Sequence, residues 1–137
     1  MTLFIGDENF PEPLVRMLDV FDHTNDVRHL TDYFDRGTDD VDWLKDLGQK
    51  DISPVIVSGD GKILRNAVET AQLRDANILF VMLASGWTNT PWDLYAWKMI
   101  RAWPIIVETV SDVRRPSLFE LPMSGNKLKI RGPISQL

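Results

Sequence analysis

Short apolar runs alternate with amphipathic helical patterns along this chain, an order that is typical of a parallel sheet covered by helices. The runs Thr2–Ile5 and Val55–Ser58 predict two buried strands, and Ile78–Leu83, the most apolar run, predicts a central one. The other predicted strands are Val27–Leu30, Ile105–Val107 and the two arms of a terminal hairpin, Phe119–Met123 and Lys127–Ile130, around Ser124-Gly125-Asn126. Pro122 restricts the first arm of that hairpin to an edge of the sheet.

Four helical patterns lie between these runs. The first begins near Pro11 and Pro13, and the next two cover about 40–49 and 62–75. The fourth begins at Thr90-Pro91-Trp92-Asp93, which offers an N-cap, a proline at the first helical position and an early acid. The apolar positions of the four are Leu14, Val15, Leu18, Val20 and Phe21; Val41, Trp43, Leu44 and Leu47; Ile63, Leu64, Val68, Ala71 and Leu73; and Trp92, Tyr95, Ala96, Met99 and Trp103. We interpret the last stripe as core, with a base-stacking face or a partner surface as the alternatives.

Composition places the chain among ordinary globular proteins. Its 137 residues and 44% apolar content fit one domain, with an α/β core over 1–107 and a C-terminal extension over 108–137. We expect no membrane span and no secretory signal, because no apolar run reaches about 18 residues and the N-terminus has no basic and then apolar pattern. The absence of Cys excludes disulfides and thiolate metal sites, and we expect a cytoplasmic protein.

The net charge of −5 is distributed unevenly. Residues 1–60 carry 14 acids and 5 bases, whereas residues 98–137 carry 7 bases and 3 acids. The basic side chains toward the C-terminus include Arg114, Arg115, Lys127, Lys129 and Arg131. This pattern fits either a solvated surface with a basic tail, or an acidic metal cluster with a basic rim that grips a phosphate backbone.

Three acids are predicted to meet at one edge of the sheet. Asp7 follows the first strand, Asp60 follows the strand Val55–Ser58, and Asp40 begins the intervening helix. The carboxyl ends of parallel strands are where open α/β folds place their sites. Carboxylates without His or Cys select hard ions, Mg²⁺ or Mn²⁺, which also bridge to phosphates. The alternatives are local: Asp40 as a helix N-cap and Asp60 as a turn residue.

Three motifs in the chain resemble a known family. Asp7-Glu8-Asn9-Phe10-Pro11 is similar to the "Asp-Glu-Asn-Leu-Pro" opening of PIN-like domains related to VapC-type toxins. Thr38-Asp39-Asp40-Val41-Asp42-Trp43 resembles the "Asp-x-x-Trp" helix start of that group, and Val57-Ser58-Gly59-Asp60 its "hydroxyl-x-Asp" strand end. The resemblance covers 3–107 and implies a three-layer, Rossmann-like PIN fold. It also implies a ribonuclease that depends on Mg²⁺ or Mn²⁺, acts on RNA and is often paired with an antitoxin; by analogy it forms a homodimer.

The resemblance also implies roles for individual residues. Asp7, Asp40 and Asp60 become the catalytic and metal-binding acids, and Ser58 becomes a hydroxyl that orients the site. Asp39 and Asp42 lie close to Asp40 in the sequence, so which of these three acids binds the metal stays open.

Further residues around these acids have candidate supporting roles. Glu8 is a fourth ligand or faces solvent, and Asn9 and Asp39 support the site. The family often places another acid shortly after Asp60, where this chain has Gly61-Lys62-Ile63, so Glu69 is a candidate substitute. Lys62 and Arg65, in the first turn after Asp60, are candidates for contacting substrate phosphate. For His23 and His29 we expect structural or surface roles.

Three other hypotheses stay open from the sequence. A two-component receiver also has acids after its first and third strands, and Ser85 supplies a hydroxyl. However, a receiver needs a Lys at the end of its fifth strand, and Ile105–Val107 is followed by Glu108 and Thr109. The second is a catalytically silent PIN-like module that binds a partner, and the third is a scaffold domain without metal.

Overall fold

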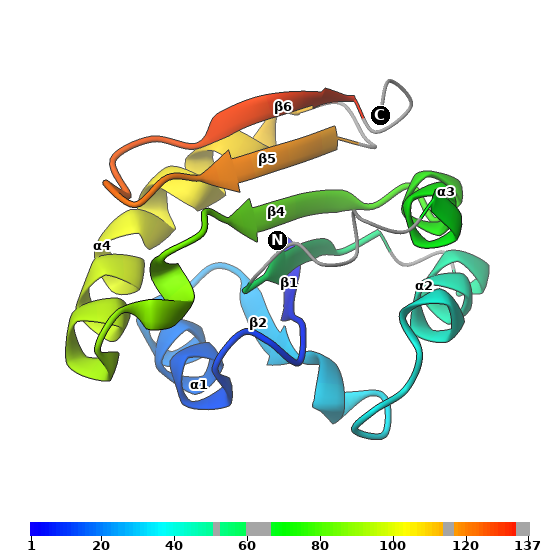
Figure 1. Cartoon of the computed structure of the whole chain (residues 1–137), viewed down its shortest axis with the longest axis horizontal. Coiled ribbons are helices and arrows are strands. Elements are labelled where there is room, and N and C mark those ends of the chain that lie inside the picture. The colour runs from blue at the N-terminus through cyan, green and yellow to red at the C-terminus, as the bar shows by residue number, and fades with distance from the viewer. Residues whose placement is uncertain (51–52, 60–66, 114–116, 134–137) are drawn as a thin grey trace.

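A computed structural model of the chain, which describes residues 1–50, 53–59, 67–113 and 117–133, has a six-stranded sheet at its centre (Figure 1). The strands are β1 (Leu3–Gly6), β2 (Asp26–His29), β3 (Val55–Ser58), β4 (Leu79–Leu83), β5 (Ser117–Leu121) and β6 (Lys129–Pro133). Their order is β2-β1-β3-β4-β5-β6, in which the first five are parallel and β6 is antiparallel to β5. The prediction of a mostly parallel α/β sheet with a C-terminal hairpin is confirmed.

Helices cover both faces of this sheet. They are α1 (Glu12–Phe21), α2 (Asp40–Gln49), α3 (Ala67–Asp75) and α4 (Trp92–Ser111), with short 3-10 turns η1 (Leu30–Asp32) and η3 (Trp87–Asn89). Helices α1 and α4 lie on one face, and α2 and α3 on the other (Figure 1). None of the helices in the described part of the chain combines the length and the apolar character that a bilayer crossing requires.

Each face of the sheet has its own hydrophobic core. Strand β3 is buried along its whole length, with Val55 and Val57 in the core beneath α1 and α4, and Ile56 in the core beneath α2 and α3. Side chains of a strand alternate between faces, so a strand covered on both sides is a continuous apolar run. This explains why Val55–Ser58 and β4 could be predicted almost to the residue.

The predicted strand Ile105–Val107 is wrong, because these residues lie inside α4. Ile106 and Val110 are buried and extend the apolar stripe of the same helix at helical spacing. Pro104 lies within the helix on its exposed side. The apolar, β-branched run after that proline is typical of a strand, but packing on the sheet overrides the local preference. The fifth strand is instead Ser117–Leu121, and the residue directly after it is Pro122, not a Lys.

Three smaller expectations also differ from the structure. The first hairpin arm is not an edge strand: β5 pairs with both neighbours, Pro122 lies just beyond its end, and β6 is the edge. Val20 and Phe21 are 78% and 46% exposed, so the buried face of α1 is only Leu14, Val15 and Leu18. Trp92 is 47% exposed and lies outside the core stripe that contains the rest of its group.

An ion pair ties α1 to the turn after β2. Arg16 donates from both terminal nitrogens to Asp32, at 2.6 and 2.8 Å, and Asp32 also accepts the backbone N–H of His29 at 2.9 Å. The hydrogen bonds from Arg16 are the main reason that the pKa of Asp32 falls from 3.8 to about 2. A carboxyl whose pKa is lowered by folding stabilises the fold above its unfolded pKa and loses that contribution as the pH falls.

We therefore expect the stability that Asp32 contributes to be complete above about pH 5 and to disappear as the pH falls from about 4 to about 2. Asp32→Asn should remove this acid-sensitive increment. The expected loss at neutral pH is about 0.5–1 kcal/mol, the range of a solvent-screened ion pair. Urea denaturation at a series of pH values measures it, with Arg16→Gln as the matched variant. An unchanged pH profile in both variants would contradict the assignment.

Candidate functional site

The candidate site lies where the order of the strands reverses. Chain connections run from β1 outward to β2 on one side, and from β3 outward to β4 and β5 on the other. Strands β1 and β3 are neighbours with Gly6 opposite Val57, and the N–H of Asp7 continues the pairing by donating to the Val57 carbonyl at 3.0 Å. Ligands of open α/β sheets bind outside the carboxyl ends of the strands at such a reversal. Asp7 is therefore fixed at the position where this class of fold places its chemistry.

Gly59 holds the two strand ends together. Its N–H donates to Asp7 Oδ1 at 3.3 Å, and the same oxygen accepts the N–H of Asn9 at 3.1 Å. A Cβ atom at Gly59 would lie 2.1 Å from the Asn9 carbonyl oxygen, far inside contact distance. Only glycine permits this approach. Asp60 is the next residue; it lies outside the described residues, so its side chain is not placed.

Asp40 is held by a tryptophan of its own helix. The indole Nε1 of Trp43 donates to Asp40 Oδ1 at 2.9 Å, and the Trp43 ring is buried in the core beneath α2 and α3. Residues three apart on a helix share a face, so the Asp-x-x-Trp spacing itself brings the two groups together. Asp39 occupies the N-cap position without a capping hydrogen bond from its side chain, and Asp42 is exposed. Within this acidic cluster, Asp40 is the member whose orientation a buried residue fixes.

Glu69 is electrostatically connected to the same cluster. It lies in the first turn of α3, the helix that packs beside α2. Burial raises the pKa of Glu69, and the negative charges of Asp40 and Asp39 raise it further. The candidate fourth acid is therefore near enough to the α2 acids to be repelled by them.

Three of the remaining predicted residues lie in the described part of the chain. Glu8 Oε1 accepts the N–H of Gly37 at 2.6 Å and so connects the Asp7 loop to the loop before α2. Asn9 is exposed, and Ser58 is the buried last residue of β3. The proposed phosphate contacts Lys62 and Arg65 lie, like Asp60, outside the described residues.

The two histidines are structural or exposed. His29 is buried, and its Nε2–H donates to the Phe10 carbonyl at 3.0 Å, because a carbonyl can only accept. Its Nδ1 then accepts from the Thr31 hydroxyl at 2.7 Å. His29 thereby holds the loop that carries Asp7 from the side of β2. Exposed His23 lies far from this loop in the chain, at the end of α1.

An aromatic group also lies at this end of the sheet. From the sequence, its helix residues Trp92 and Tyr95 are both expected in the core. The η3 residue Trp87 packs edge-on against Tyr95, with ring centroids 5.4 Å apart, and Trp92 lies 6.4 Å from Tyr95. The Tyr95 hydroxyl is buried, and none of the described residues forms a hydrogen bond with it. Burial raises its pKa, and the charge of Asp7 adds to the shift. The Tyr95 hydroxyl is therefore neutral, and the negative charge of Asp7 acts on it.

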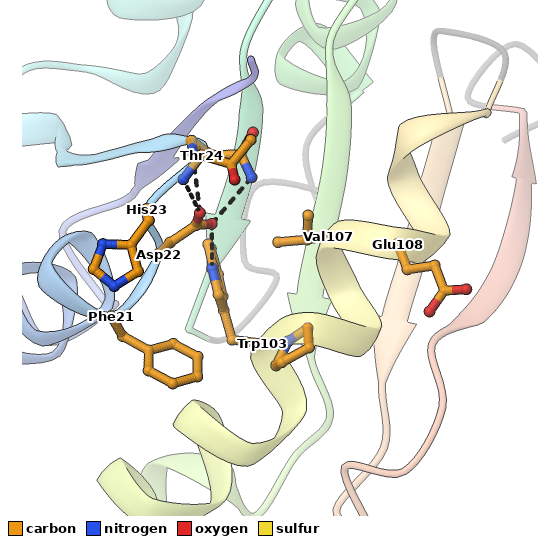
Figure 2. A pocket seen from close by; sticks show the side chains of 9 residues that line it. Phe21, Asp22, His23, Thr24, Trp103, Val107 and Glu108 are labelled. Carbon is orange, nitrogen blue, oxygen red and sulfur yellow. Dashed lines mark hydrogen bonds between the residues drawn. The ribbon is translucent and has the colours of Figure 1, made fainter.

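A separate pocket of about 400 Å³ lies at the opposite edge of the sheet, between the end of α1 and the second half of α4 (Figure 2). Trp103 Nε1 donates to Asp22 Oδ2 at 3.0 Å, and Asn25 Nδ2 donates to the same oxygen. Burial alone would raise the pKa of Asp22, but these bonds and the backbone N–H groups of Asn25 and Thr24 lower it. The Asp22 carboxylate is fully engaged in joining the α1–β2 loop to α4, which is a structural role.

The candidate acids are carboxylates, the donors that a hard divalent cation prefers. Burial is the main cause of the raised pKa of Glu69, and repulsion by Asp40 and Asp39 adds to it. Among residues 1–50, 53–59, 67–113 and 117–133, no three acidic or histidine side chains converge closely enough to hold an ion. Asp60, the third acid of the predicted site, lies outside these residues.

Comparison with protein families gives one match: the model described as "PIN like domain" matches residues 1–85. The match covers more than half of the chain, so this protein belongs to the PIN-like domain family. It has a nuclease-type fold, and domains of this family generally bind nucleic acid and use a divalent metal. Neither the curated proteins nor the solved structures give a match.

We expect Gly59→Ala to disturb the Asp7 loop, because the added methyl group meets the Asn9 backbone and not a movable side chain. Overpacking of this kind costs about 1–3 kcal/mol. Urea denaturation measures the loss, and the backbone amide NMR shifts of Asp7 and Asn9 should move most. A variant with parental stability and unmoved shifts would mean that the two strand ends do not meet in this way.

We expect Glu69→Gln to stabilise the metal-free protein at neutral pH. A carboxyl whose pKa is raised by folding destabilises the fold as the pH rises above 4.5, its ordinary value, and removing the charge removes that effect. Thermal melting in EDTA at pH 5 and pH 7 tests this. Glu108→Gln, on the exposed side of α4, is the control that should change nothing.

Proposed function

We propose that this chain is a ribonuclease that hydrolyses RNA phosphodiesters with Mg²⁺ or Mn²⁺. The observation that carries the proposal is the fixed position of Asp7 at the strand-order reversal, with its carboxylate bonded to the N–H of Gly59, directly before Asp60. Membership of the PIN-like family supports it, since a nuclease-type fold has its chemistry at this edge. In the proposal, Asp7, Asp40 and Asp60 hold the ion, with Glu69 as a candidate fourth acid.

The ion supplies charge neutralisation on the phosphodiester and activation of water. The chain's own residues do the positioning. The Gly59 and Asn9 N–H groups fix one oxygen of Asp7, Trp43 fixes one oxygen of Asp40, and Glu8 holds the Asp7 loop against Gly37. Ser58, buried at the end of β3, supplies the hydroxyl that orients the site, and Lys62 and Arg65 contact the substrate phosphates.

The other sequence hypotheses fare differently against these observations. The receiver hypothesis loses its ground, because the chain belongs to the PIN-like family and β5 is not directly followed by a Lys. The silent PIN-like module shares the fold and the positions of Asp7 and Asp40, so only turnover separates it from the nuclease.

Cleavage of a mixed single-stranded RNA in Mn²⁺ and in EDTA tests the proposal. We expect metal-dependent cleavage that Asp7→Asn and Asp60→Asn each abolish, with circular dichroism showing that both variants stay folded. Asp42→Asn is the matched control: it removes an exposed acid from the same helix turn as Asp40 and should leave most of the activity. Cleavage that persists in Asp7→Asn overturns the site. A folded parent without cleavage supports the silent module.

We extend the proposal, on the sequence resemblance alone, to a cytoplasmic toxin with an antitoxin partner and a homodimeric state. Expression of the chain in a bacterial host should then arrest growth, and Asp7→Asn should relieve the arrest. Normal growth with both the parent chain and Asp7→Asn would argue against the toxin role. The ribonuclease proposal would still be tested by the cleavage assay.

A further inference from the structure

The first half of α4 has two sides that carry different residues. Trp92, Tyr95 and Lys98 follow each other at intervals of three and so share one side. Trp97 lies two residues after Tyr95 and is therefore roughly opposite to it around the helix. The first side lies at the carboxyl edge of the sheet, because Tyr95 packs against Trp87 and Trp87 follows the carboxyl end of β4.

Trp92 is the exposed member of the aromatic group on that side. Its neighbours Trp87 and Tyr95 are buried and packed edge-on, which gives a rigid base beneath it. Trp92 itself is 47% exposed and lies tilted beside Tyr95, with 6.4 Å between the ring centroids. An indole that is exposed, instead of buried with the rest of its stripe, offers a flat surface on which a nucleobase can stack.

Lys98 supplies a positive charge on the same side. Its Nζ lies 4.9 Å from the centre of the Trp87 ring. In the part of the chain that the structure describes, no carboxylate forms an ion pair with Lys98. Arg16, Arg28 and Arg36, by contrast, are all paired with acids. Lys98 therefore places a positive charge on the aromatic group Trp87, Tyr95 and Trp92, of which Trp92 is the exposed member. A cation together with an exposed aromatic ring is a combination that binds single-stranded nucleic acid.

We propose that the side of α4 formed by Trp92, Tyr95 and Lys98 binds a single-stranded nucleic acid, with a base stacked on Trp92 and a phosphate on Lys98. This inference rests on the proposed function and deepens it, because it names the surface along which the strand enters the Asp7 site. The buried Tyr95 ring supports Trp92 from beneath. Double-stranded nucleic acid does not fit this role, because its bases are already stacked in the duplex and cannot reach the indole.

The test measures binding without cleavage. A short fluorescein-labelled oligouridine is titrated in EDTA with the Asp7→Asn chain, and fluorescence anisotropy gives Kd. Adding Trp92→Ala should weaken binding at least about fivefold, the lower end for one stacked base, and Trp92→Phe should keep most of it. Lys98→Ala should lower the slope of log Kd against log salt by about 0.7, the value for one phosphate contact on a single strand.

The opposite side of the same helix provides a matched control. Trp97 is 56% exposed and carries Arg101 over its ring, so it has the same chemistry in the same helix but lies roughly opposite to Tyr95. Trp97→Ala should leave both Kd and the salt slope unchanged. Circular dichroism of each variant excludes unfolding as the cause of a weaker Kd.

Each outcome decides the inference separately from the nuclease proposal. Equal losses in Trp92→Ala and Trp97→Ala, no loss in Trp92→Ala, or no binding by Asp7→Asn overturns the strand-binding surface. RNA cleavage by the parent can still occur in those cases and is measured separately. Binding that depends on Trp92, in a chain that never cleaves RNA, supports the surface and removes the ribonuclease.

Discussion

The structure depends above all on how closely the end of β3 approaches the loop after β1. Gly59 lies against the Asn9 carbonyl where no other residue fits, and its N–H reaches Asp7. The same approach completes the pairing of the two central strands through the Asp7 N–H and the Val57 carbonyl. His29 holds the other side of the loop through the Phe10 carbonyl. One contact between backbones therefore fixes the centre of the sheet and the position of the acid together.

Much of the fold could be predicted because the central strands are buried on both faces. Such strands are continuous apolar runs whose ends are marked by polar residues, as Val55–Ser58 is. The Ile105–Val107 run has the same local character, yet it belongs to α4, since Ile106 and Val110 continue a stripe that begins many residues earlier. Local preference predicts the wrong element for this run, because whether it forms a strand or a helix depends on what its side chains contact in the folded chain.

Part of the candidate site could also be predicted from the sequence, and part of it could not. The position of Asp7 at the carboxyl edge could be predicted, because it directly follows a strand of a parallel sheet. The need for glycine at position 59 could not, because nothing local shows that the Asn9 carbonyl lies against it. The separation of Trp92 from its own stripe was also hidden: the first residue of a helix has no preceding turn to bury it, so its exposure depends on how η3 leads into α4.

The hydrogen bond from Trp43 to Asp40 has a consequence for how this domain can vary. Asp40 and Trp43 belong to a single helical turn, and the hydrogen bond joins the carboxylate of Asp40 to the indole N–H of the buried Trp43. A change of register in α2 would move the carboxylate and withdraw the indole from the core at the same time. Selection for a folded chain and selection for a correctly placed acid thus act on the same two residues. A lineage that has lost its chemistry can therefore retain the complete motif, simply because the fold still requires it.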